Sequence, residues 1–219
     1  FNSDSQKLEY FNGQIWMQVH TFSPNLGGNG NESTAPTGIS ADYVSGPRGI
    51  WAGGSTPTVL ATIDYINIAT AGDAVDFGDL NEVKSEGAPS SSNTKGIFAG
   101  GYNGPNRTAN TSYIIIPTTG DGVDYNDLTS ATNIALGFGN QTRGFTAGGK
   151  SPSNTDVIEY TTIASNSDWK DFGDSTAAHI SGSGCATPTR GVYSLGFVTP
   201  ARVANIDYVA IPTLGNALD

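Results

Sequence analysis

The sequence predicts an all-β fold, a β-propeller of about four blades, on three observations. One motif recurs along the chain at steps of 47, 48 and 47 residues, and repeats of roughly 40 to 50 residues are typical of propeller blades. Short runs that alternate apolar and polar residues, rich in β-branched and aromatic side chains, predict strands. Glycine supplies 29 of the 219 residues, so turns interrupt every stretch that is long enough for a helix.

The recurring motif is a cation, a short apolar run and two glycines. "RGIWAGG" (48–54) has near-copies at 95–101, 143–149 and 190–196, and the last copy departs by ending in Leu195-Gly196. A proline, a tyrosine and an aspartate follow each copy in the same order. The residues that keep this register are Arg48, Gly53, Gly54, Tyr65, Asp76, Lys95, Gly100, Gly101, Tyr113, Asp124, Arg143, Gly148, Gly149, Tyr160, Asp171, Arg190, Gly196, Tyr208 and Asp219.

Each repeat is predicted to hold four short strands. One begins at the cation, one carries the tyrosine (62–70, 112–119, 157–165, 205–213) and one carries the aspartate (74–80, 122–128). The segment before each cation, such as 38–47 or 133–142, supplies the fourth. A single four-stranded sheet cannot bury both of its faces, so stacked repeats must bury them against each other.

The glycine motif is predicted to be structural. A phosphate-binding loop needs a helix behind its glycines to meet the anion, and no helical pattern follows any copy. The repeated cations are expected to pair with the repeated carboxylates Asp76, Asp79, Asp124, Asp127, Asp171 and Asp174, which would help to set the strand register. A ring of cations that binds an acidic ligand is the alternative.

No catalytic residue, cofactor or metal is expected, and the chain is predicted not to be an enzyme. The two histidines, His20 and His179, lie in unrelated parts of the pattern, so a site with three imidazole ligands cannot form. The acidic turn at 120–127 lacks the spacing of a calcium-binding loop. We expect Cys185 to be a small buried residue, and Trp51 and Trp169 to pack inside the fold, with a sugar-stacking platform as the alternative.

Charge and loops indicate which partners to expect. A net charge of −10 repels nucleic acid and anionic membranes, and no apolar run is long enough to predict membrane insertion. Loops on a rigid scaffold often carry recognition. The loop after the second glycine pair, within 102–110, is therefore the candidate recognition site, with Tyr102, Asn103, Asn106 and Arg107.

Three regions are predicted. Residues 1–22, including Trp16, form a hairpin with a turn at Asn12-Gly13, residues 23–35 form a Gly/Asn-rich linker, and residues 36–219 hold the propeller repeats. The last repeat stops at Asp219, before its outer strand is complete. In one interpretation the N-terminal segment, which starts at Phe1, completes that strand and closes the ring; an open array, another subunit or residues beyond this chain are the alternatives.

The strand ending in Gly-Gly, followed by a tyrosine-bearing strand and an aromatic outer strand, resembles the Kelch repeat. Phe77, Tyr125 and Phe172 stand where Kelch repeats carry an outer tryptophan. The combination "RG-x-x-AGG … IDY … DFGDL" is similar to repeats in bacteriophage tail proteins, and residues 1–19 resemble a short tail-fibre element.

This resemblance implies a non-enzymatic phage virion structural protein, a tail fibre or surface appendage for host attachment or subunit assembly. The implied partners are other virion proteins, copies of itself in a homo-oligomer, and a host surface glycan. The alternatives are an extracellular, lectin-like carbohydrate-binding propeller and, less favoured because no partner domain accompanies the repeats, an intracellular Kelch adaptor.

Overall fold

The computed structural model describes residues 8–11, 16–19 and 48–219. The chain divides into two compact units, Phe1–Ile39 and Ser40–Asp219. In the first unit, β1 (Leu8–Phe11) pairs antiparallel with β2 (Trp16–Val19). The turn predicted at 12–13, the linker predicted at 23–35, the strand predicted within 38–47 and the closing segment at the N-terminus lie outside the described residues.

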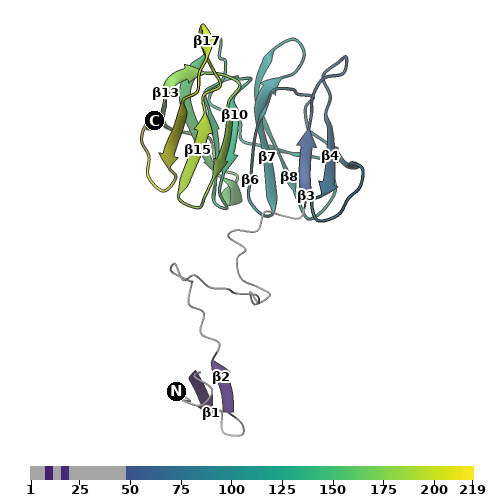
Figure 1. Ribbon diagram of the computed structural model, residues 1–219. Helices are drawn as coiled ribbons and strands as arrows, with labels where there is room; N and C mark the ends of the chain where they lie inside the picture. Colours follow the sequence, from purple (N-terminus) through teal and green to yellow (C-terminus); the bar gives the residue numbers. More distant parts are fainter. Residues whose placement is uncertain (1–7, 12–15, 20–47) are drawn as a thin grey trace. The chain divides into compact units, whose positions relative to one another are not determined.

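The second unit is all-β, as the sequence predicts, and its sheets are antiparallel. Four sheets follow one another along the chain, one for each sequence repeat (Figure 1). Sheet 1 contains β3 (Arg48–Ala52), β4 (Thr62–Asn67) and β5 (Val75–Asp79); sheet 2 contains β6 (Ala88–Ser91), β7 (Lys95–Tyr102), β8 (Arg107–Ile115) and β9 (Val123–Tyr125). Sheet 3 contains β10 (Leu136–Gly139), β11 (Arg143–Ala147), β12 (Thr155–Thr162) and β13 (Lys170–His179); sheet 4 contains β14 (Ser183–Ala186), β15 (Arg190–Ser194) and β18 (Ile206–Ala210).

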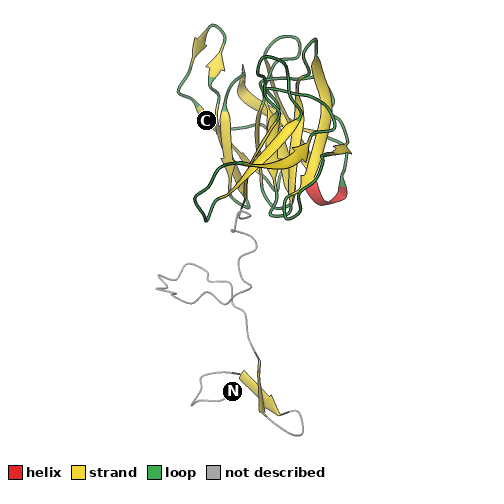
Figure 2. Ribbon diagram, turned by 90° about the vertical axis from the view of Figure 1, so that its right-hand side faces the viewer, coloured by secondary structure: helices red, strands yellow, loops and turns green. Residues whose placement is uncertain are grey.

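Two smaller elements complete the described part of this unit. The strands β16 (Phe197–Val198) and β17 (Ala201–Arg202) form a hairpin beside sheet 4. A single 3₁₀ turn, η1 (Ile163–Ser165), stands out in red in Figure 2 among strands and loops. Among the described residues, no helix has the length and apolar character needed to cross a membrane.

The four repeats keep the same strand register. In every sheet the tyrosine lies opposite the residue two positions after the cation: Tyr65 pairs with Ile50, Tyr113 with Ile97, Tyr160 with Phe145 and Tyr208 with Val192. In sheets 1, 2 and 3 the tyrosine also pairs with the first residue of β5, β9 or β13. In sheet 4 an isolated bridge between Tyr208 and Leu218 takes the place of this pairing. The four tyrosines therefore occupy equivalent places, because the side-chain period of a strand preserves the face as well as the register.

The hydrophobic core lies between consecutive sheets. Three clusters of buried side chains form, one at each junction between neighbouring sheets. The largest joins sheets 3 and 4 around Phe138, Phe145, Phe172 and Tyr193. The sheet faces that meet at these three junctions are thus buried against each other.

The first strands of sheets 2, 3 and 4 run close to one another, and glycine makes this approach possible. A Cβ atom on Gly137 of β10 would lie 2.0 Å from the carbonyl oxygen of Pro89 in β6. Gly184 of β14 and Gly191 of β15 leave room for the Phe138 ring in the same way. Glycine at these positions of β10, β14 and β15 therefore lets neighbouring sheets come together there.

Candidate functional site

The repeated cations lie over the repeated tyrosines. The charged groups of Arg48, Lys95, Arg143 and Arg190 stand 4.5, 4.4, 4.8 and 4.5 Å from the ring centroids of Tyr65, Tyr113, Tyr160 and Tyr208. Three of the cations also donate to a backbone carbonyl oxygen of the next sheet: Arg48 to Ile116 at 2.6 Å, Lys95 to Ile163 at 3.1 Å, and Arg143 to Ile211. Each of these bonds spans 68 residues, so the cation links two repeats.

The expectation that these cations pair with the repeated aspartates is wrong. The register of sheet 1 places Arg48 opposite Asn67, whereas Asp79 lies opposite Thr62 at the other end of the sheet and Asp76 lies opposite Asp64. A carboxylate at either position is too far along the sheet to reach the cation. The tyrosine ring and the carbonyl oxygen take its place, and the interaction that they make is a cation–π contact with a charge-assisted hydrogen bond.

The glycine pairs hold the connection between repeats. The first glycines, Gly53, Gly100 and Gly148, have φ of +71°, +60° and +63°. A Cβ on them would lie 2.1, 2.5 and 2.7 Å from the carbonyl oxygens of Lys84, Thr132 and His179, respectively. The second glycine of each pair donates its N–H to that same carbonyl at 2.8 to 2.9 Å. The motif therefore builds the junction between repeats, because only glycine fits both this conformation and this contact.

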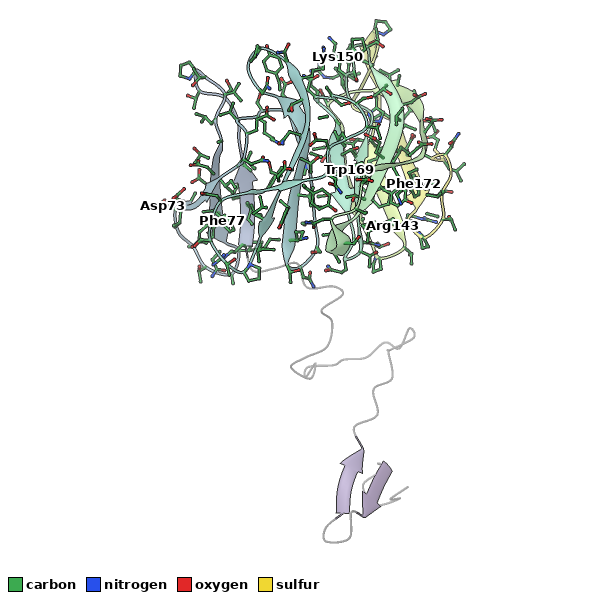
Figure 3. The ribbon with its side chains drawn as sticks, turned by 180° about the vertical axis from the view of Figure 1, so that it is seen from behind. Asp73, Phe77, Arg143, Lys150, Trp169 and Phe172 are labelled. Atoms are coloured by element: carbon green, nitrogen blue, oxygen red, sulfur yellow. The ribbon has the colours of Figure 1, made fainter. Side chains whose placement is uncertain are left out.

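A small turn follows each glycine pair, and the four turns are equivalent. Bridges Ser55–Val59 and Lys150–Asn154 close the turns of sheets 1 and 3, the pair Tyr102–Arg107 closes that of sheet 2, and the β16–β17 hairpin forms that of sheet 4. Lys150 lies at one end of the sheets and Arg143 toward the opposite end (Figure 3). The turns thus lie away from the cations and form the candidate recognition surface.

The predicted recognition residues lie in the turn of sheet 2, which is shorter than the predicted loop. Tyr102 ends β7 and Arg107 begins β8, so only 103–106 form the connection. The Asn103 side chain donates to Glu82 at 2.9 Å, and Arg107 donates to Asn133 at 2.8 Å. Asn106 is exposed and donates its backbone N–H to Asn103 Oδ1 at 3.1 Å.

A hollow of about 400 Å³ adjoins this turn. Tyr102, Asn103 and Gly104 line one side of it, and Pro57, Thr58 and Val59 from the turn of sheet 1 line the other. Two of the predicted residues, Tyr102 and Asn103, therefore face a common space with a second turn. Asn106 and Arg107 lie beyond its lining.

A second cavity, of about 380 Å³, is lined by residues of all four sheets, among them Arg48, Ser90, Phe138 and Cys185. Cys185 is exposed there, so the expectation of a buried thiol is wrong. Trp169 is buried as expected, but Trp51 is 58% exposed, and its assignment to the core is wrong. Sequence pattern placed Trp51 on a core face, yet among the described residues no sheet covers that face.

The carboxylates in the acidic turn of sheet 2 do not converge on one point. Asp121 accepts from Asp79 N–H, Asp124 accepts from Asn81 and Asn110, and Asp127 accepts from Thr111 N–H. Each carboxylate is therefore oriented toward a different neighbour. Within 48–219, no group of three or more potential metal-ligating side chains converges.

One serine lies against a histidine, which sequence analysis missed because the two residues belong to no repeated motif. Ser175 Oγ is 3.2 Å from His179 Nε2 and 2.9 Å from Tyr193 Oη. All three side chains are buried, and burial lowers the pKa of His179 and raises that of Tyr193. A catalytic serine needs access to substrate, so burial of the whole group supports a role in packing.

Lys84 is another buried polar residue that sequence analysis missed. Its Nζ donates to the backbone and side-chain oxygens of Asn110, both at 2.9 Å. Burial lowers the pKa of Lys84 from 10.5 to about 8, against the opposing effect of nearby carboxylates, chiefly Glu82. The side chain joins the link after sheet 1 to strand β8 of sheet 2. Thr132 and His179, its equivalents at the next two junctions, differ in chemistry, so no repeated pattern reveals the position.

The buried lysine predicts a rise in stability at alkaline pH. Because the pKa of Lys84 is lower in the folded state, the unfolded chain binds more protons between pH 8 and 10.5. This group should therefore add about 2 kcal/mol to the free energy of unfolding as the pH rises from about 8 to about 10. Urea unfolding of the wild type and of Lys84→Met across this range measures the difference. Equal pH dependence in the two proteins would contradict the assignment.

Neither the protein-family models nor the curated proteins searched give a match to this chain.

Proposed function

We propose that this chain is a non-enzymatic structural protein of a bacteriophage virion, a tail fibre or another surface appendage. Its repeats form a Kelch-like β-propeller of about four blades that displays the turns after the glycine pairs for host attachment or subunit assembly. Within the virion, its partners are other virion proteins, further copies of the chain, and a glycan on the host surface.

The observation that carries the proposal is the use of the repeated motif inside the fold. The cations link one sheet to the next, and the glycine pairs hold the connections between them. The four turns remain at the surface, as do the repeated aspartates Asp76, Asp124 and Asp171. A scaffold in which the repeated residues build the body and variable turns cover one end suits display on a virion, because recognition residues are held by rigid strands.

Shortening the turn of sheet 2 tests the role in attachment. Replacing the four residues 103–106 with Gly-Gly should preserve the strands, since two-residue turns of this type join antiparallel strands. We expect binding to host cells or to a glycan array to fall at least about tenfold, because Asn103 leaves the hollow. The same replacement of residues 151–153, the turn that the Lys150–Asn154 bridge closes in sheet 3, is the matched control. Unchanged binding by both variants would remove the turn of sheet 2 from the recognition surface, and tight co-purification with virions would then favour an assembly role.

A lectin-like carbohydrate-binding propeller outside the phage context is the second candidate. The hollow between the turns of sheets 1 and 2 favours it, because an aromatic side chain, Tyr102, lies there beside the polar Asn103 and Thr58. Such a mixture of one ring and a few polar groups is typical of small-ligand sites. Glycan binding by the purified chain without any incorporation into virions would favour this candidate.

A further inference from the structure

Consecutive sheets contact each other through two different faces. We call the face toward the following sheet the trailing face and the face toward the preceding sheet the leading face. At each of the three junctions the trailing face supplies the cation and one inward-facing residue of the strand that carries the tyrosine. The leading face supplies the isoleucine whose carbonyl oxygen accepts a hydrogen bond from the cation. The inward residues are Ile63, Thr111 and Ile158, and the isoleucines are Ile116, Ile163 and Ile211; all six are buried.

The leading face of sheet 1 carries the same features in an exposed form. Ile68 follows β4 at the position that Ile116, Ile163 and Ile211 hold in the other sheets, and its side chain is 61% exposed. Trp51, opposite Asp64, holds the position at which Tyr193 of sheet 4, opposite Asp207, is buried, yet Trp51 is 58% exposed. Within the described part of the chain, no sheet covers this face.

The trailing face of sheet 4 is exposed in the complementary way. Ile206 stands opposite Ser194, as Ile63 stands opposite Ala52, yet Ile206 is 57% exposed. Arg190 lies over Tyr208 like the other three cations and is exposed. The described residues offer its guanidinium no carbonyl acceptor from a following sheet.

We propose that the trailing face of sheet 4 binds the leading face of sheet 1 in a second copy of this chain. In this head-to-tail contact Arg190 donates to the carbonyl oxygen of Ile68 in the other copy, and Ile206 packs beneath it. The second copy is the fitting partner because its face repeats the residues that already pack at the three internal junctions. Ile68 and Ile206 are exposed together, so the described residues 48–219 of one copy do not cover these two faces themselves.

Such an interface is heterologous, because two different surfaces meet in it. Each copy that uses one face keeps the other free, so copies join into a closed ring or a longer array. An isologous dimer buries the same surface on both copies. Variants that each alter one of the two faces, measured alone and mixed, therefore distinguish a heterologous interface from an isologous one.

The test measures the mass of the full chain in solution by light scattering at about 100 µM, where a micromolar affinity gives mostly associated protein. The wild type is expected at two copies or more. Ile68→Asp and Ile206→Asp should each give single copies, since each buries a charge at the contact. A mixture of the two variants retains one intact pair of faces and should form a dimer that grows no further. Ile115→Asp, an exposed isoleucine on sheet 2, is the matched control and should keep the wild-type mass.

A single-copy wild type at this concentration would overturn the proposal, and so would a mixture of the two variants that stays at one copy. An equal loss in Ile115→Asp would show a general effect of charge. Thermal unfolding of the variants checks their folding. As a second probe, Arg190→Met should weaken association about tenfold or more, because a charge-assisted hydrogen bond is lost without adding a charge.

Discussion

Replacing Phe145 with alanine is expected to lower the free energy of unfolding by about 4 kcal/mol. The Phe145 side chain is fully buried in the largest core cluster. Its ring stacks on Phe138 with centroids 4.8 Å apart and meets Phe172 edge-on at 5.1 Å. Alanine removes both contacts and leaves a cavity that the strands cannot close, because β10, β11 and β13 are held by their own ladders.

Urea unfolding followed by circular dichroism measures this loss. Val157→Ala in the same sheet is the control, because Val157 is exposed and its truncation should change the free energy by less than about 0.5 kcal/mol. Phe145→Leu fills part of the space and should cost about half as much as alanine. Similar losses in Phe145→Ala and Val157→Ala would mean that this cluster does not hold sheets 3 and 4 together.

The repeat predicts the strands well because register and side-chain period are local properties. The tyrosines, the glycine pairs and the strand order within sheets 2 and 3 all follow from patterns within one repeat. Phe77, Tyr125 and Phe172 likewise share one environment, since each buried ring meets the repeated tyrosine edge-on at 5.8 to 6.0 Å. Their equivalence is visible in the spacing alone.

Contacts between repeats are not visible in the spacing. Arg48 donates to the backbone carbonyl oxygen of Ile116. Every residue has a backbone carbonyl, so the sequence does not indicate which one accepts this bond. A carboxylate was the expected partner because opposite charges attract and the aspartates recur with the same period as the cations. Which sheets stack, and at what rotation, decides instead that a carbonyl reaches the cation.

The prediction of which side chains are buried is wrong at Trp51 for the same reason. Trp51 and Tyr193 hold the same position in their repeats, yet Tyr193 is buried against Phe138 of sheet 3 and Trp51 is exposed. Strand pattern identifies the face on which a side chain lies, but only the presence of a neighbouring sheet decides whether that face is covered. Cys185 is exposed on the first strand of sheet 4 because it faces the cavity that the four sheets line.

Substituting the first glycine of a pair is expected to have the second large effect. A Cβ on Gly100 would lie 2.5 Å from the carbonyl oxygen of Thr132 and 2.8 Å from Leu128 Cδ1, and its φ is +60°. Gly100→Ala should therefore cost about 3 kcal/mol in the free energy of unfolding, from the strained conformation and the displaced backbone together. The displacement also lengthens the 2.8 Å hydrogen bond from Gly101 N–H to the same carbonyl.

Two further variants separate strain from contact. Gly72→Ala is the control, because nothing lies within 4 Å of its Cβ position and its φ lies outside the positive range that favours glycine. This variant should change the free energy of unfolding by less than about 0.5 kcal/mol. Asparagine tolerates a positive φ better than alanine does. If the contact with Thr132 dominates, Gly100→Asn must therefore remain as destabilised as Gly100→Ala. A clear recovery in Gly100→Asn would assign the cost to backbone conformation alone, and the glycine pair would then serve as a turn and not as the close contact that joins one repeat to the next.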